Sequence, residues 1–239
     1  MRNPIIAALD VPSAEAALAL AAQVAPAVGA FKVGSELFTA AGPTMVRQLR
    51  ATGAHVFLDL KFHDIPNTVS KAVTAAVQLD VQMLTVHASG GLEMMRAAEE
   101  AAQNAARALK RVPPLVVGVT VLTSMDTSQL AELGIAGTVA RQVERLAALA
   151  VKAGLRALVC SPLELLALRE LVPASMQLIT PGIRTGAEKP DDQKRTLSPV
   201  EALAAGADWL VIGRPIYAAS DPRSAADTIF NSLASNAKQ

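Results

Sequence analysis

The feature that most constrains the fold of this chain is a regular alternation of short β-type runs with longer helical segments. Eight short runs of apolar or β-branched residues occupy residues 5–9, 30–34, 55–60, 83–87, 115–121, 157–160, 176–180 and 209–212. Ala- and Leu-rich segments with helical spacing lie between them, for example residues 13–24, 92–109 and 139–151. Such alternation indicates parallel strands with right-handed crossovers, and eight strands fit a closed barrel better than an open sheet. We therefore predict an α/β fold, a (β/α)8 barrel in a single domain over residues 1–239.

Length and composition agree with one domain and limit the partners. The 239 residues are 51% apolar, but no uncharged run approaches the roughly 20 residues of a membrane-spanning helix. The first ten residues contain too short an apolar stretch for a secretory signal. A net charge of +1 and 3% aromatic residues lack the basic excess or stacking residues of a nucleic-acid binder. We expect a soluble, cytoplasmic protein that binds a small molecule, with no nucleic-acid partner and no membrane partner.

Polar residues recur where the predicted strands end. In a (β/α)8 barrel the active site lies at the carboxyl ends of the strands, so these residues are the candidates for chemistry. In chain order they are Asp10, Lys32, Asp59, Lys61, Asp64, His87, Thr123, Ser124, Arg184, Gly213 and Arg214.

The third strand end carries the densest set of charges. Side chains alternate along a strand, so Asp59 and Lys61 should point to the same side, with Asp64 just beyond the strand. Carboxylates favour the charged form of a neighbouring lysine, so Lys61 should keep its proton until a stronger base is present. Asp10 and Lys32 extend the alternating charges over three adjacent strand ends. Buried ion pairs stabilise proteins poorly, so this array indicates catalysis rather than structure.

The last two strand ends predict a phosphate site. Gly213 would let backbone N–H groups approach an anion, and Arg214 supplies a fork of donors. Barrels often bind phosphate after strands 7 and 8. The long irregular segment 181–196, which has the composition of a mobile loop, adds Arg184 and Gln193.

A metal centre and a cysteine nucleophile are less well supported. The histidines could form a metal site with the nearby carboxylates, but the ammonium of Lys32 or Lys61 would repel a divalent cation. That repulsion is roughly 4 kcal/mol per unit charge pair at about 4 Å and an effective dielectric of about 20. The one cysteine, Cys160, lies in an apolar run typical of a buried structural thiol. We expect no metal and no cofactor.

Several motifs resemble the bacterial orotidine 5′-phosphate decarboxylases over nearly the whole chain. They are IIAALDVPS (5–13), FKVGSELF (31–38), LDLKFHDIPNT (58–68), TVHASGG (85–91), TVLTSM (120–125), TPGIR (180–184), the Asp192-Gln193 pair and VIGRPI (211–216). LDLKFHDIPNT is highly specific, whereas a bare Asp-x-Lys-x-x-Asp also occurs in related sugar-phosphate enzymes.

The resemblance implies an activity and a role for each matching residue. It implies cofactor-independent decarboxylation of orotidine 5′-phosphate to uridine 5′-phosphate in pyrimidine biosynthesis, with Lys61 as the proton donor to C6. The implied charged network is Lys32, Asp59, Lys61 and Asp64. The implied substrate contacts are Asp10 and Lys32 to the ribose, Thr123 and Ser124 to ribose or base, and Arg184, Gln193, Gly213 and Arg214 to the phosphate. The implied assembly is a homodimer in which Asp64 and Thr68 reach the neighbouring site.

Three other readings remain open at this point. A metal-dependent keto-sugar-phosphate decarboxylase or epimerase would share Asp59, Lys61 and Asp64, but the decarboxylase would carry an acidic ligand at the position of Lys32. A Schiff-base aldolase needs an easily neutralised lysine, unlike one placed between carboxylates. A catalytically silent phosphate-binding barrel would need no charge array.

Overall fold

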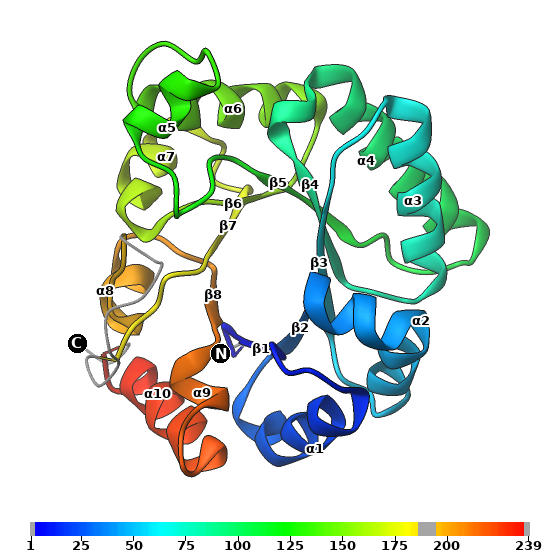
Figure 1. Ribbon diagram of the computed structural model, residues 1–239, viewed down its shortest axis with the longest axis vertical. Coiled ribbons are helices and arrows are strands. Elements are labelled where there is room, and N and C mark those ends of the chain that lie inside the picture. The colour runs from blue at the N-terminus through cyan, green and yellow to red at the C-terminus, as the bar shows by residue number, and fades with distance from the viewer. Residues whose placement is uncertain (1–2, 186–194, 237–239) are drawn as a thin grey trace.

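The computed structural model describes residues 3–185 and 195–236 and forms a closed barrel. Eight parallel strands follow each other in chain order, and β8 pairs with β1 to close the ring. The strands form the inner ring and the helices surround it (Figure 1). This confirms the predicted (β/α)8 barrel. Within the described residues, no helix is both long and apolar enough to cross a membrane.

The strands and helices have the following bounds. The strands are β1 (Ile5–Ala8), β2 (Ala30–Gly34), β3 (Val56–Phe62), β4 (Met83–His87), β5 (Leu115–Val119), β6 (Ala157–Val159), β7 (Gln177–Thr180) and β8 (Trp209–Ile212). The helices are α1 (Ala14–Val24), α2 (Ser35–Ala51), α3 (Pro66–Gln78), α4 (Leu92–Ala108), α5 (Thr127–Glu132), α6 (Val139–Ala153), α7 (Leu165–Leu171), α8 (Pro199–Ala204), α9 (Arg214–Tyr217) and α10 (Pro222–Asn236).

Local sequence signals explain where many helices begin. The side chain of Ser13 caps α1, and Ser198 forms a capping box with Glu201 at α8. Pro66 occupies the first position of α3, where its missing N–H costs nothing. Pro43 lies inside α2 next to Gly42, whose positive φ of 64° kinks that helix.

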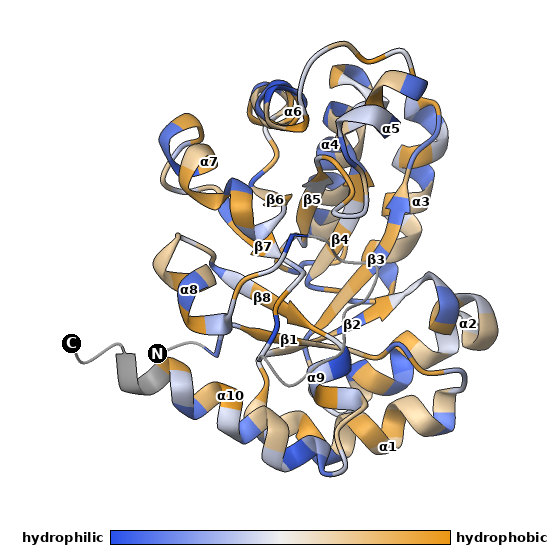
Figure 2. Ribbon diagram, turned by 60° about the vertical axis from the view of Figure 1, so that its left-hand side comes forward, coloured by the Kyte–Doolittle hydropathy of each residue, from blue (hydrophilic) through white to orange (hydrophobic). Residues whose placement is uncertain are grey.

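Two layers of apolar packing hold the barrel together. The larger layer lies between the strands and the surrounding helices, and it includes Met94, Met95 and Cys160. A smaller cluster fills the barrel interior; its buried members are Ile6, Ala30, Phe57, Met83, Val117, Ala157, Ile179 and Trp209. Hydrophobic colouring predominates in the strands, and hydrophilic segments lie mainly on the outer helices (Figure 2).

The interior cluster determines which residues face the site. Side chains alternate along a strand, so the residues two and four positions after the cluster also face the barrel axis. From Ile6 this places Asp10 at the axis, and from Ala30 it places Lys32 and Gly34 there. The interior is therefore apolar at its base and charged toward the carboxyl ends.

Strand β3 departs from regular alternation next to the site. Its register against β4 shifts between Leu58 and Phe62, and Lys61 adopts a left-handed backbone with φ of 51°. Few non-glycine residues adopt this region, and it costs on the order of 1–3 kcal/mol. The bulge extends β3 to Phe62, beyond the predicted end at residue 60.

Candidate active site

A cavity of about 350 Å³ opens at the carboxyl ends of the strands. Charged residues line part of it and apolar residues line the rest. The lining residues that we predicted from the sequence are Asp10, Lys32, Asp59, Lys61, Thr123, Arg184, Gly213 and Arg214. With Val159 of β6 included, residues from seven of the eight strands or the loops after them meet in one cavity.

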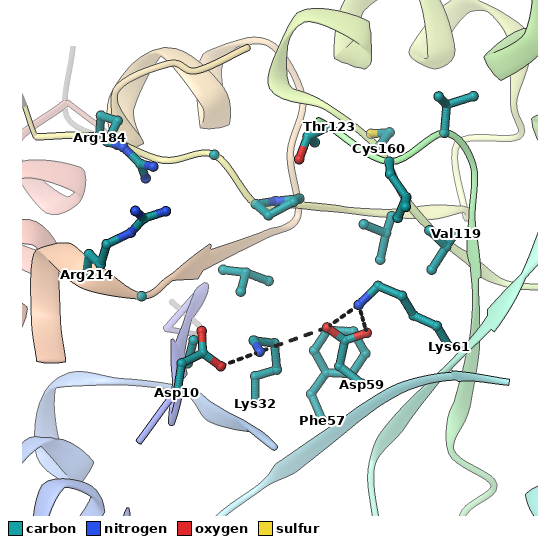
Figure 3. A pocket seen from close by; sticks show the side chains of 18 of the residues that line it. Asp10, Lys32, Phe57, Asp59, Lys61, Val119, Thr123, Cys160, Arg184 and Arg214 are labelled. Atoms are coloured by element: carbon teal, nitrogen blue, oxygen red, sulfur yellow. Dashed lines mark hydrogen bonds and ion pairs between the residues drawn. The ribbon is translucent and has the colours of Figure 1, made fainter. Parts of the chain in front are cut away.

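Four charged side chains form an alternating row along one side of the cavity. The Nζ of Lys32 lies 2.8 Å from Oδ1 of Asp10 and 4.0 Å from Oδ2 of Asp59. The Nζ of Lys61 lies 2.9 Å and 3.0 Å from the two carboxylate oxygens of Asp59. Figure 3 shows the row, with Asp10 at one end and Lys61 at the other. The two ammonium groups and the two carboxylates sum to no net charge.

The centre of the row is the least accessible part. The side chains of Lys32 and Asp59 are 12% and 14% exposed, compared with 35% for Lys61 and 40% for Asp10. Charges removed from water interact more strongly with each other and with any bound charge. They also stabilise the fold poorly, because desolvation offsets their attraction. The row is therefore better suited to act on a ligand than to hold the barrel together.

Thr85, which the sequence analysis did not identify, holds Lys61 and Asp59 in place. The fully buried hydroxyl of Thr85 accepts the backbone N–H of Lys61 at 2.8 Å and donates to Oδ1 of Asp59 at 3.0 Å. It thereby supports the left-handed backbone of Lys61 and orients the carboxylate that holds its ammonium. The signal available in the sequence was weak: Thr85 lies two residues after Met83, and so faces the same interior.

Gly34 leaves room for the ammonium of Lys32. A Cβ at Gly34 would lie 2.9 Å from Nζ of Lys32 and 3.5 Å from Oδ1 of Asp10. Any side chain there would push the lysine away from its carboxylate partner. The glycine in the FKVGSELF motif is therefore explained by space rather than by backbone conformation.

The opposite end of the cavity carries two guanidinium groups. Arg184 follows β7 and Arg214 follows β8, and Figure 3 shows both side chains at the end of the cavity away from Lys61. A Cβ at Gly213 would lie 3.4 Å from Cε1 of Tyr217 and 3.7 Å from Oδ2 of Asp10, which are ordinary contacts, so no steric clash requires glycine here. Paired guanidinium groups bind phosphate well because they supply several directed donors.

Tyr217 is a polar lining residue that the sequence analysis did not identify. It lies three residues after Arg214 in α9, a spacing that brings two side chains to one side of a helix. Partial burial, followed by the carboxylate of Asp10, raises the pKa of its phenol, so the hydroxyl remains a hydrogen-bond donor.

The wall between the charged ends is largely apolar. Phe57, Val119, Val159 and Val211 line it, with the hydroxyl-bearing Thr123 among them. The cavity thus suits a flat, partly apolar ligand that carries an anionic group at one end and a reacting centre at the other.

Cys160 contributes to the wall but is not suited to nucleophilic chemistry. Its side chain is buried, and this burial raises the pKa of the thiol far above its usual range. The thiolate is the reactive form of cysteine, so a thiol kept protonated is inert.

Other candidate residues lie away from this cavity. Asp64, Thr68 and Ser124 are exposed, and the carboxylate of Asp64 accepts the N–H of Ile65 at 2.6 Å. Within the described contacts of this chain, Lys61 is hydrogen-bonded to Asp59 and not to Asp64. Gln193 lies outside the described residues.

Among the described residues, the histidines do not assemble a metal site with acidic side chains. Across residues 3–185 and 195–236, no group of three or more His, Cys, Asp or Glu side chains is placed to hold an ion. The rings of His63 and His87 lie 5.5 Å apart. Burial, followed by the proximity of His63 and Lys61, lowers the pKa of His87, so this ring tends to remain neutral.

Comparison with known proteins gives a consistent result over nearly the whole chain. Residues 3–229 match the model of the Orotidine 5'-phosphate decarboxylase / HUMPS family. The chain is 52% identical to an orotidine 5'-phosphate decarboxylase of Nitrosococcus oceani, with 94% of each chain covered. It is also 52% identical to one from Pseudomonas aeruginosa, covering 97% of this chain and 98% of that protein. The crystal structure of orotidine 5'-phosphate decarboxylase from Lactobacillus acidophilus superposes with a TM-score of 0.86 at 35% identity, covering 97% of this chain and 99% of that one.

Proposed function

This chain belongs to the orotidine 5'-phosphate decarboxylase / HUMPS family, and we propose that Lys61 is the proton donor in its reaction. The protein is an orotidine 5'-phosphate decarboxylase, a carboxy-lyase of pyrimidine nucleotide biosynthesis. The bond between C6 of the pyrimidine and its carboxylate breaks, carbon dioxide leaves, and a proton takes its place to give uridine 5'-phosphate.

The position of Lys61 supports its role at C6. The electron pair left at C6 lies in the ring plane and is not conjugated with the ring carbonyls. A fixed ammonium stabilises this localised charge more than the dispersed charge of the substrate carboxylate, as transition-state selectivity requires. Lys61 then gives its proton to C6 and regains one from water. Asp59, which holds Nζ of Lys61 through two hydrogen bonds, orients the donor.

The rest of the row and the wall would hold the nucleoside. Asp10 and Lys32 lie between the reacting end and the arginines, where the ribose hydroxyls of a bound nucleotide would be. Thr123 faces the cavity and would contact ribose or base, whereas the adjacent Ser124 is exposed.

The arginine end would bind the phosphate. Arg184 and Arg214 would supply side-chain donors, and the backbone at Gly213, which lines the cavity between them, could approach the anion. We include Gln193 in this set on the basis of the family motif alone. Phosphate is remote from the bond that breaks, so its binding energy can be used to fix the substrate against the charged row.

A homodimer would complete the site. Asp64 and Thr68 are exposed, and Asp64 lies with Ile65, a 65% exposed apolar residue, beside a second surface pocket. Within the described part of the chain, Asp64 is bonded only to the adjacent backbone N–H of Ile65, so a second subunit packed on this face could cover Ile65 and engage the carboxylate. We propose that each subunit contributes Asp64 and Thr68 to the cavity of its neighbour.

The observation that carries the proposal is one cavity with an alternating charge row at one end and two arginines at the other. The test is an assay with purified protein that follows the loss of orotidylate absorbance and identifies uridine 5'-phosphate as the product. Turnover is expected. Binding of uridine 5'-phosphate without turnover would instead indicate a silent phosphate-binding barrel.

A chelator distinguishes the metal-dependent relatives. The ammonium groups of Lys32 and Lys61 flank Asp59, so a divalent cation there would be repelled by both. Full activity after exhaustive treatment with EDTA is expected. Loss of activity that added Mg²⁺ restores would contradict the cofactor-independent mechanism.

A further inference from the structure

A buried ion pair outside the cavity joins three loops at its rim. The guanidinium of Arg195, in the segment between β7 and α8, pairs with the carboxylate of Glu164, which follows β6. Nη2 of the same guanidinium donates to the carbonyl oxygen of Leu122, after β5, at 3.3 Å. The side chains of Glu164 and Arg195 are only 8% and 17% exposed. Neither residue lines the cavity.

The carboxylate of Glu164 is rigidly held. Its second oxygen accepts the backbone N–H of Ser161 at 2.8 Å, and the two residues form a capping box at a short 3-10 helix, Pro162–Glu164. Burial raises the pKa of Glu164, while the charge of Arg195 opposes that effect. A fixed carboxylate in little water is a well-defined anchor for a guanidinium.

Arg195 is connected through the backbone to Arg184, the residue proposed to bind the phosphate. Leu197, two residues later, forms a parallel bridge with Ile183, and its carbonyl oxygen accepts the N–H of Arg184 at 3.0 Å. On the other side, Leu122 directly precedes Thr123 in the cavity wall. The Arg195 side chain thus links the segment of Arg184 to the segment of Thr123.

We propose that Glu164 and Arg195 are positioning residues that fix the arginine end of the cavity relative to its nucleoside wall. This inference rests on the proposed function, because it assigns Arg184 to the phosphate and Thr123 to the nucleoside. The pair sets the separation of two parts of the substrate site without touching the substrate. Small displacements of positioned groups can reduce rates by up to about 100-fold.

The test compares ligands with and without phosphate in the variants Glu164→Gln and Arg195→Met. Glutamine can still accept the N–H of Ser161, so the first variant removes the charge and keeps the helix cap. Affinities for uridine 5'-phosphate and uridine are measured by calorimetry, and kcat/KM is measured for orotidylate. We expect the affinity for the nucleotide and kcat/KM to fall about 10- to 100-fold, and the affinity for uridine to stay within about twofold.

The chain offers a matched control at the opposite end of the barrel. Glu99 pairs with Arg156 at 3.2 Å, and that guanidinium donates to the carbonyl oxygen of Pro114, just before β5. Among the described residues, one buried polar atom of each pair has no hydrogen-bond partner: Oε2 of Glu99 in this pair and Nε of Arg195 in the other. Glu99→Gln therefore makes the same chemical change far from the cavity, and its ratio of nucleotide to nucleoside affinity should equal that of the wild type.

Three results would overturn the inference. They are an equal loss of nucleotide and uridine affinity in Glu164→Gln, an unchanged nucleotide affinity, or the same selective loss in Glu99→Gln. Arg195→Lys, which keeps the charge but not the fork of donors, should recover part of the loss if Arg195→Met folds poorly. The ratio of nucleotide to uridine affinity is a binding measurement. It can stay unchanged in Glu164→Gln while the wild-type protein still turns over orotidylate, and that result would contradict this inference but not the proposed function.

Discussion

Asp59 holds Lys61 through both of its carboxylate oxygens, at 2.9 Å and 3.0 Å from the lysine nitrogen. Two hydrogen bonds to one carboxylate leave the ammonium little rotational freedom, so its remaining N–H is aimed rather than mobile. A proton donor that is oriented before the substrate binds needs no reorganisation during the reaction.

Replacing Lys61 with alanine should abolish decarboxylation and leave the fold intact. The variant loses both an acid, worth about 10²–10⁴-fold, and a charge that stabilises the carbanion, so kcat should fall by at least about 10⁴-fold. Orotidylate turnover and circular dichroism measure the two effects. Lys152→Ala, on the exposed side of α6, is the control. A near-normal rate in Lys61→Ala would remove Lys61 from the mechanism.

Replacing Thr85 with valine should affect both stability and turnover. Valine matches the shape of threonine but leaves the N–H of Lys61 unpaired, at a cost of about 1–3 kcal/mol in unfolding free energy. Misorientation of Asp59 should also lower kcat on the order of tenfold. Thr120→Val removes another buried hydroxyl, which donates to the carbonyl oxygen of Val159. In urea titrations it should lose less stability, because the carbonyl oxygen of Val159 keeps the backbone N–H of Thr120 at 3.2 Å, and its kcat should stay normal; equal kcat values in the two variants would argue against the role of Thr85.

Replacing Arg214 with alanine should weaken turnover as well as binding. If phosphate binding energy fixes the substrate against the charged row, its loss lowers kcat and raises KM, each by about 10-fold or more. Steady-state kinetics separate the two parameters. Arg141→Ala, at an exposed position of α6, is the control. Unchanged turnover at saturating orotidylate would show that Arg214 contributes to affinity alone.

His87 should make the folded protein less stable in mild acid. Burial, with smaller contributions from His63 and Lys61, lowers the pKa of His87 below its ordinary value of 6.5. The unfolded chain then binds this proton at higher pH than the folded chain, so the unfolding free energy falls as pH decreases through about 6.5. His87→Asn should reduce this fall in urea titrations between about pH 7.5 and about pH 5.5. An identical pH dependence in both proteins would contradict the assignment.

Much of the fold followed from sequence periodicity. The predicted strands at residues 30–34, 83–87 and 209–212 match β2, β4 and β8 to the residue. Other strand ends differ by one or two residues, as at β1 and β5, where the chain turns toward the cavity. Periodicity reports which face is buried, and it is less informative where a strand ends among polar residues.

The site was predictable where strand order alone brings residues together. Lys32 and Asp59 lie on adjacent strands and Asp10 just after the strand next to them, so their convergence followed from the barrel. The hydrogen bond from Lys61 to Thr85 could not be predicted in this way, because it depends on a register shift between β3 and β4. Asp64, close to Lys61 in the sequence, is exposed and accepts the N–H of Ile65 instead, since the chain enters α3 within two residues.

The left-handed backbone at Lys61 sets the stability of the fold against catalytic activity at a single position. Glycine would relieve the strain at this position, whereas lysine keeps a Cβ that this conformation disfavours by about 1–2 kcal/mol. Populations screened only for heat resistance should therefore accumulate glycine or asparagine at residue 61. Populations that must make their own uridine nucleotides should keep lysine and tolerate a lower melting temperature.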